Sequence, residues 1–517
     1  MKLRKVYFLL LCLVSGFMLR AHHLSSRSLW TDESLTFLEA TGHGIEANNF
    51  LSTLSRKEYP QLLTAKDFKR FLKVEPHETI KDVSRGILHT DTHPPLYFWI
   101  IHIWMKPFGD GLLAVRAFSL LMGMISILLA YKMGAYLFSK EVGDYCALFT
   151  AICAFSVRFS QEARAYSLIM VIGLAAGLCI LRLQRFNKNS DAVGFAFLNA
   201  IGIYTHYFYF FIAAAHVLYF CSARPRDRAK TEKFLLAFLC SLLLWLPWWN
   251  MVMAKTYNSN YVKWIFGFPG YLDKLRAAAT GWSRYLIMAN QPLSKADHLF
   301  LFCSAAFFVY IAFCALRDMA EKYRQPFFFC AIIFFTPLLG MLLIDIACNS
   351  VILKQERYWT FPLIGFIPFA GYVLSVVFSQ KRLAGYLLIL LMLMSSWMVS
   401  EVQFGPAPKH TSNWINKESG GKDAAVIVYN IRSTVLPQAY YLADGIYVFP
   451  VSHEQQLSQT LVTCLNYAER VFITHHYHRA AVSLLNPPFM GINASDLGFR
   501  LKGEMSRDDI KVTEFVK

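Results

Sequence analysis

The chain has 517 residues, of which 56% are hydrophobic, 16% aromatic and only 16% charged. A composition this apolar over such a length excludes a single soluble domain and is typical of a polytopic membrane protein. The formal net charge of +17 is spread over short basic clusters between apolar runs, which is a pattern of membrane topology and argues against nucleic acid as a partner. Most of the 11 cysteines lie in apolar runs, so we expect free thiols, Cys348 and Cys464 included.

The first apolar segment covers residues 6–19 and follows Lys2, Arg4 and Lys5. The positive-inside rule places its start in the cytoplasm and the residues after it outside. No small-x-small cleavage pattern precedes Ala21, so we expect an uncleaved first span. Residues 25–94 are polar and mixed in charge, which predicts a first extracytoplasmic loop with short helices.

Two adjacent acids, Asp32 and Glu33, stand near the start of this loop, where a span meets water. Such a pair can act as a general base and its electrostatic companion. It can equally be a solvated helix cap, since aspartate is common at helix starts. The acidic pair considered alone favours the interpretation as a helix cap. The residues downstream favour the interpretation as a general base.

Further apolar runs follow, after a short helix predicted from Pro94-Pro95 to Met105. With the first segment they make about eleven membrane-spanning helices, in a transmembrane domain of residues 1–402. The basic loops at Lys140, Arg182 to Lys188, Arg224 to Lys233, Arg317 to Arg324 and Lys381-Arg382 all fall on the cytoplasmic side of this topology. The runs are residues 112–137, 144–157, 165–181, 192–204, 207–221, 234–253, 298–316, 326–346, 358–378 and 383–399.

The second large extracytoplasmic loop, residues 255–296, is basic although it is assigned outside. It contains Lys274, Arg284 and Trp264 among other basic and aromatic residues. One explanation is that loops of this length translocate regardless of charge. The other is a flap that closes over an anionic, lipid-linked ligand.

A proline-bearing stretch, residues 403–408, separates the spans from a C-terminal region of residues 403–517. Short β-branched runs at 424–429, 446–451 and 471–474 alternate there with helical patterns at 436–443, 454–468 and 478–485. This alternation predicts a small α/β domain with parallel strands, extracytoplasmic by topology. His475, His476 and His478 lack a cysteine or acidic partner in metal-binding spacing, so we expect no metal there.

Ionisable groups at three other outer turns are functional candidates, because charges at span ends are costly in lipid. The first turn holds Glu162 and Arg164, which can also simply pair with each other. The second holds His206, where a lone histidine is often interfacial filler, and the third holds Arg357 and Tyr358. In a folded bundle we expect these turns to converge with the acidic pair on one face.

These motifs together, Asp32-Glu33, His93-Pro94-Pro95-Leu96, Gln161-Glu162-Ala163-Arg164-Ala165-Tyr166 and Glu356-Arg357-Tyr358, resemble the polytopic GT-C glycosyltransferases. The resemblance is to bacterial relatives of protein O-mannosyltransferases and lipid A aminoarabinose transferases, from Trp30 to about Phe378. It implies an inner-membrane enzyme of the cell envelope that moves a sugar, with inversion, from a polyprenyl-phosphate donor to a glycan, glycolipid or protein outside. Ser34-Leu35, after the acidic pair, departs from the common pattern.

The chemistry of glycosyl transfer suits these residues, because the acceptor hydroxyl loses a proton while the leaving phosphate gains charge. We assign Asp32 as general base, Glu33 as its modulator and Arg357 as the stabiliser of the phosphate. A divalent cation on Asp32 and Glu162 is compatible with the reaction, but a monophosphate leaving group requires no cofactor. The remaining substrate-binding candidates are His93, Glu162, Arg164, His206, Trp264 and Tyr358.

Two other classes remain open. A secondary transporter or lipid flippase for a lipid-linked substrate is also polytopic, but it usually has internal repeats and acids at mid-membrane. No repeat is visible here, and the candidate charges gather at one face. A non-catalytic assembly protein is the third reading, against which the intact acidic pair argues only mildly.

Overall fold

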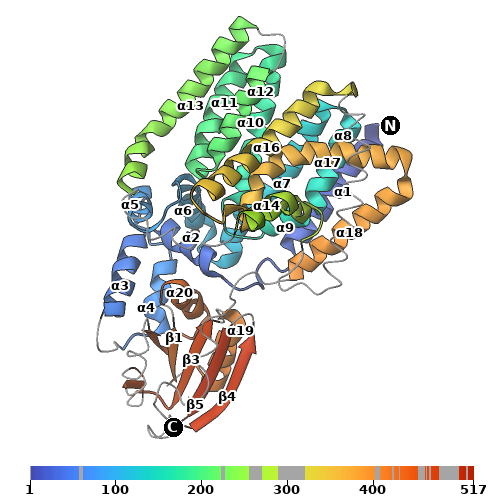
Figure 1. The fold of residues 1–517 in the computed structure, drawn as a ribbon. Coiled ribbons are helices and arrows are strands. Elements are labelled where there is room, and N and C mark those ends of the chain that lie inside the picture. Colours follow the sequence, from blue (N-terminus) through green and yellow to red (C-terminus); the bar gives the residue numbers. More distant parts are fainter. Residues whose placement is uncertain are drawn as a thin grey trace. The chain divides into compact units, whose positions relative to one another are not determined.

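A computed structural model describes residues 2–56, 62–222, 227–255, 270–288, 321–401, 408–421, 424–429, 431–451, 460, 463–464, 467–476, 500–507 and 510–516. The chain forms two compact units, which interleave along the sequence (Figure 1). The helical unit comprises Met1–Leu24, Thr92–Tyr97 and Arg116–Val402. The α/β unit comprises Ser25–Asp91, Phe98–Val115 and Gln403–Lys517. Each unit is described by itself below.

The helices of the helical unit follow the predicted apolar runs closely, and the run at 298–316 lies outside the described residues. The long helix α7 spans the predicted run without a shift at either end, although its first four residues belong to the α/β unit. The elements are α1 Lys2–Ala21, α7 Leu112–Leu137, α8 Lys140–Ile152, α9 Ala154–Phe159, α10 Tyr166–Phe186, α11 Asn189–Thr205, α12 Tyr209–Ser222, α13 Arg228–Lys255, α14 Tyr271–Thr280, η3 Gly281–Tyr285, α16 Arg324–Ala347, η4 Ile352–Lys354, η5 Glu356–Trp359, α17 Thr360–Gln380 and α18 Arg382–Glu401.

Five of the described helices are long and apolar enough to cross a membrane, namely α7, α10, α16, α17 and α18. The protein is therefore a multi-pass membrane protein. Helices α10 and α17 are 72% and 78% buried over their apolar windows, whereas α7, α16 and α18 are only 33–44% buried. The first two are thus central, and the other three expose apolar side chains that suit contact with lipid.

The predicted apolar run at 144–157 is broken into α8 and α9 at Cys153, whose backbone is extended. The break leaves the carbonyls at the end of α8 free to accept bonds from the fully buried Arg20 of α1. Its guanidinium donates to Thr150 O and Ala151 O, both at 2.9 Å. Helix ends need such partners when they are buried, so Arg20 caps α8 and ties it to α1.

Glycines let the central helix α17 approach its neighbours at backbone distance. A Cβ on Gly365 would lie 2.6 Å from Phe334 N and 2.7 Å from Cys330 O of α16. A Cβ on Gly371 would lie 2.8 Å from Cys146 N of α8. Close approach at small residues is the usual way in which membrane helices gain packing energy, because lipid offers no hydrophobic drive between them.

The α/β unit contains a five-stranded sheet in the order β2-β1-β3-β5-β4. Strands β1, β2 and β3 pair in parallel, which confirms the predicted pattern, and β4 and β5 add an antiparallel hairpin that the sequence did not predict. The elements are α2 Thr31–Thr41, α3 Gly44–Arg56, α4 Ala65–Lys69, η1 Arg70–Leu72, α5 Ile80–Thr90, α6 Leu96–Phe108, α19 Pro408–Ser419, β1 Ala424–Tyr429, α20 Ile431–Tyr441, β2 Tyr447–Val451, β3 Arg470–His476, β4 Arg500–Arg507 and β5 Ile510–Val516.

The first long loop and the C-terminal sheet belong to the same unit. Val448 N at the sheet edge donates to Leu63 O at 2.8 Å, and Ala65 N donates to Ile446 O at 2.9 Å. Lys69 Nζ donates to the carboxylate of Asp444 at 2.7 Å, which lowers the pKa of that carboxyl group. Residues 62–69 thus extend the sheet edge and dock the loop onto it.

Candidate active site

A buried arginine–carboxylate cluster lies where α9 leads into α10. Arg158 Nε donates to Glu162 Oε1 at 3.2 Å, and its Nη1 pairs with the carboxylate of Glu356 at the start of η5. Arg158 and Glu162 are 7% and 5% exposed. A charged group this deeply buried needs such partners. By pairing with both carboxylates, Arg158 joins the predicted outer turn with Glu162 to the one with Glu356.

Sequence reasoning missed the role of Arg158 and left Glu356 without one. A pair of Glu162 with Arg164 was considered, but the hydrogen bond from Arg158 to Glu162 was not. The signal was available, because an arginine beside the apolar run 144–157 is a functional or structural candidate by default.

Arg284 of η3 adds a further cation to this region. Burial lowers the pKa of its guanidinium, while the nearby negative charge of Glu356 works in the opposite direction. Its Nη1 is buried and has no hydrogen-bond partner among the described residues. An arginine N–H directed into protein without an acceptor is suited to an anionic ligand such as a phosphate oxygen.

A second group, the cation–ring cluster, consists of Arg164, His93, His206, Tyr358 and Arg357. Arg164 Nη2 lies 3.4 Å from His93 Nε2, so this nitrogen is the acceptor and the ring proton is on Nδ1. The ring of His93 lies 5.7 Å, edge to face, from that of His206. The ring of His206 in turn lies 5.8 Å from that of Tyr358, and the Arg357 guanidinium carbon is 5.6 Å from the Tyr358 ring centre.

The helix ends of the bundle position this cluster. His93 precedes the two prolines before α6, Arg164 precedes α10, His206 follows α11 and Tyr358 precedes α17. Phe208 N donates to His206 Nδ1 at 3.1 Å, which holds the ring in place with its proton on Nε2. Five of the predicted substrate-binding residues are thus brought together within the helical unit.

Asp32 and Glu33 occupy the first turn of α2 in the α/β unit. The N-cap residue is Trp30, with an extended backbone and no side-chain cap bond, so neither acid is the N-cap itself. Both benefit from the positive end of the helix dipole. Glu33 is fully buried, whereas Asp32 is partly exposed and thus accessible to a substrate.

Only part of the basic loop at 255–296 is described, and Trp264 lies outside the described residues. Lys274 is 3% exposed and donates to Asp345 O and Asn349 Oδ1, both at 2.7 Å. It therefore has a structural role at the end of α16. Arg276 is exposed beside Asp273, whereas Arg284 is close enough to the arginine–carboxylate cluster for the charges of Glu356 and Arg158 to affect its pKa.

Comparisons with known proteins give one family match over part of the chain and several solved structures of similar fold. Residues 92–250 match the family of dolichyl-phosphate-mannose-protein mannosyltransferases. This segment contains the turns with His93, Glu162, Arg164 and His206. No curated protein matches the sequence significantly.

Solved structures with similar folds cover nearly the whole chain. The structure of ArnT from Cupriavidus metallidurans bound to undecaprenyl phosphate matches with a TM-score of 0.54 at 11% identity, over 98% of this chain and 97% of that one. The apo oligosaccharyltransferase from Archaeoglobus fulgidus matches with a TM-score of 0.51 at 12% identity, over 91% of this chain and 69% of the other. The Archaeoglobus fulgidus oligosaccharyltransferase AglB, in complex with an inhibitory peptide and a dolichol-phosphate, gives a TM-score of 0.50 at 12% identity, with coverages of 91% and 69%.

These likenesses confirm the resemblance that the motifs indicated. At such low identity they establish the fold, and the family match covers the segment that carries four of the predicted site residues. The chain accordingly has the fold of the GT-C glycosyltransferases, and its residues 92–250 match the model of the dolichyl-phosphate-mannose-protein mannosyltransferase family.

Proposed function

We propose that the protein is an inverting glycosyltransferase that moves a hexose or pentose from a polyprenyl-phosphate donor to a glycan, glycolipid or protein acceptor. The reaction takes place on the outer side of the inner membrane. Among its fold relatives, one ArnT structure holds undecaprenyl phosphate and one AglB structure holds a dolichol-phosphate, which supports a polyprenyl phosphate as the lipid.

In the proposed reaction, Asp32 accepts the proton of the acceptor hydroxyl as its oxygen attacks the anomeric carbon of the sugar. The bond from that carbon to the phosphate oxygen breaks, and the polyprenyl phosphate departs with one more negative charge. Arg357 and Arg284 stabilise this charge through N–H donors suited to phosphate oxygens. Glu33, beside the base, tunes its proton affinity or orients the acceptor.

The observation that carries the proposal is the cation–ring cluster, in which two arginines flank two histidine rings and a tyrosine ring at helix ends. Guanidinium groups bind phosphate, and aromatic rings and imidazole N–H groups suit the faces and hydroxyls of a sugar. The buried, unpartnered Nη1 of Arg284 supports the same ligand chemistry.

We also propose a number of membrane crossings and a side of the membrane for the α/β unit. Five described helices are candidate spans. The shorter or less apolar helices, together with the apolar run at residues 298–316, bring the proposed number of crossings to about eleven. On this topology the α/β unit is extracytoplasmic, where polar acceptors are available. A divalent cation on Asp32 and Glu162 remains compatible with the reaction and is not required by it.

A donor panel tests the function. Detergent-purified protein is incubated with radiolabelled sugars on undecaprenyl phosphate, one sugar at a time, in the presence of membrane glycolipid acceptors. Consumption of one donor with release of undecaprenyl phosphate is the expected result. Transbilayer movement of the intact donor in proteoliposomes, with no cleavage of any donor, would instead identify a flippase.

A further inference from the structure

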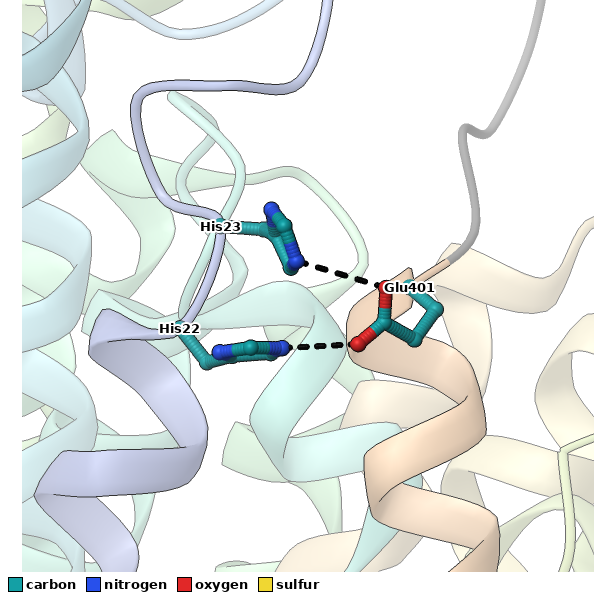
Figure 2. Close-up of side chains that lie close together, drawn as sticks. All are labelled: His22, His23 and Glu401. Atoms are coloured by element: carbon teal, nitrogen blue, oxygen red, sulfur yellow. Dashed lines mark hydrogen bonds and ion pairs between the residues drawn. The ribbon is translucent and has the colours of Figure 1, made fainter.

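A group of metal-ligating side chains to which the proposed function gives no role lies at the ends of α1 and α18 (Figure 2). His22 Nε2 is 2.8 Å from Glu401 Oε1, and His23 Nε2 is 3.3 Å from Glu401 Oε2. The two imidazoles thus meet the two oxygens of one carboxylate, and the three ligand atoms lie within 4.8 Å of one another. Among the described residues, no other set of three such groups comes this close.

We propose that His22, His23 and Glu401 bind one zinc ion, with water completing the coordination. Two imidazole nitrogens and one carboxylate oxygen are a ligand set typical of zinc, and they disfavour calcium and magnesium, which prefer oxygen ligands. Bonds of about 2.1 Å in a tetrahedral site place ligand atoms about 3.4 Å apart. The contacts at 2.8 and 3.3 Å are close to this spacing, so small side-chain shifts suffice.

The ring of His22 is oriented before any ion binds. His22 stacks on Trp397 at 4.3 Å, and Trp397 lies one helical turn before Glu401 on α18. Gln161 Nε2 donates to His22 O at 2.8 Å, which fixes the backbone at the end of α1. Supporting contacts of this kind raise the affinity of a metal site, because less ordering is needed on binding.

The backbone turn at His23 brings consecutive rings to the same carboxylate. Neighbouring residues of a helix point about 100° apart, so a continuing helix would direct only one of them at Glu401. His23 has a φ of 54°, in the left-handed region that non-glycine residues adopt uncommonly. This conformation ends α1 and places both Nε2 atoms at Glu401.

Charge and access also suit a cation. The side chains of His23 and Glu401 are 41% and 44% exposed, so an ion and its water ligand can reach them from solvent. Arg20, the nearest cation along the chain, does not compete for Glu401, because its guanidinium is buried and donates to Gly16, Thr150, Ala151, Ser156 and Ser160.

The position of the site indicates its role. His22 and His23 precede Leu24, and Glu401 precedes Val402, the two residues at which the chain leaves the helical unit for the α/β unit. An ion shared by these ligands would hold the ends of α1 and α18 together at both connections. The site is therefore structural, and its occupancy is independent of the proposed transfer reaction.

The test measures zinc binding by the full-length protein in detergent, after EDTA treatment and desalting. Zinc bound per protein is determined by mass spectrometry of the metal over a titration, and apparent Tm is followed in parallel. Glu401→Gln and His23→Gln should each bind one equivalent of zinc fewer than wild type. The affinity of this site for zinc should be lowered at least about 10-fold in each variant. Zinc at about 100 times its Kd should raise the apparent Tm of wild type by about 3 °C and that of the variants by much less.

His77→Gln is the matched control, because His77 is an exposed histidine beside a single glutamate, Glu78, at 3.6 Å. It should bind zinc as wild type does. Equal stoichiometry and affinity in wild type, His23→Gln and Glu401→Gln would overturn the proposal. A Tm that falls in these variants but never responds to zinc in wild type would show hydrogen bonding alone, and would overturn it as well.

Discussion

The guanidinium of Arg158 forms an ion pair with the carboxylate of Glu356, which lies 198 positions later in the chain. The same guanidinium donates to Glu162, four residues later in the chain. Two carboxylates therefore neutralise one deeply buried cation and join the start of α10 to the start of α17. The motifs at Gln161–Tyr166 and at Glu356–Tyr358 are held in place by this arginine.

Replacement of Arg158 by methionine should destabilise the protein severely. It keeps much of the side-chain volume but leaves the buried Glu162 without its described partner, at a cost of about 3 to 5 kcal/mol. Glu356→Gln should be milder, since Glu356 is more exposed and Glu162 still neutralises Arg158. Thermal melting of the purified variants measures both, and a Tm for Arg158→Met equal to that of wild type would disprove a structural role for the pair.

Gly281 should not tolerate a side chain. A Cβ at this position would lie 1.8 Å from Cζ2 of Trp359, whose ring is fully buried and whose Nε1 donates to Leu353 O at 3.0 Å. Gly281→Ala is expected to cost about 1 to 3 kcal/mol and to displace the segment with Arg357 and Tyr358. Gly111→Ala, where nothing lies within 4 Å, is the control and should melt as wild type. Equal melting of the two variants would contradict this packing.

Arg357→Lys should lower sugar transfer markedly, and Arg357→Ala should lower it further. Lysine keeps the charge but lacks the planar fork that holds a phosphate through two N–H groups. Arg276→Ala removes an exposed arginine of the neighbouring α14 and should leave transfer unchanged. Single-turnover transfer and donor binding are the measurements. If both Arg357 variants keep the donor affinity and the transfer rate of wild type, Arg357 does not bind the phosphate, and Arg284 becomes the candidate for that role.

Topology can be tested by cysteine labelling in intact spheroplasts, with the exposed Cys221 and Cys348 replaced by serine. A membrane-impermeant maleimide should label Glu469→Cys of the α/β unit and should not label Asp227→Cys, in a basic connection between helices. Permeabilised cells, in which both positions should react, are the control. The opposite labelling pattern would place the active face in the cytoplasm.

The helices were predictable because apolar runs of span length have few alternative structures. Helix α7 and strand β1 coincide with their predicted ranges, since continuous apolar sequence determines both. The break at Cys153 was not predictable, because the carbonyls that it frees are capped by Arg20, more than a hundred residues away in the chain. Strand β4 is mostly polar, so its sequence gave little signal for the hairpin that it forms with β5.

The sequence predicted which residues gather at the candidate site better than it predicted the hydrogen bonds that join them. The motifs identified His93, Arg164, His206, Arg357 and Tyr358, which do form one cluster. The bond of Glu162 to Arg158 was not predicted. The joining of residues 62–69 to the C-terminal sheet was equally hidden, because such long-range contacts leave no local pattern.

The central claim is that Asp32 is the general base, and the variant Asp32→Asn tests it most directly. Asparagine keeps the shape of the side chain at the start of α2 but cannot accept the proton. The measurement is single-turnover sugar transfer from a polyprenyl-phosphate donor by detergent-purified protein, with thermal melting alongside and Glu33→Gln for comparison. We expect a folded variant that binds the donor and transfers at least about 100-fold more slowly, with a smaller loss for Glu33→Gln. Near-normal transfer by well-folded Asp32→Asn would contradict the account and remove Asp32 from the mechanism.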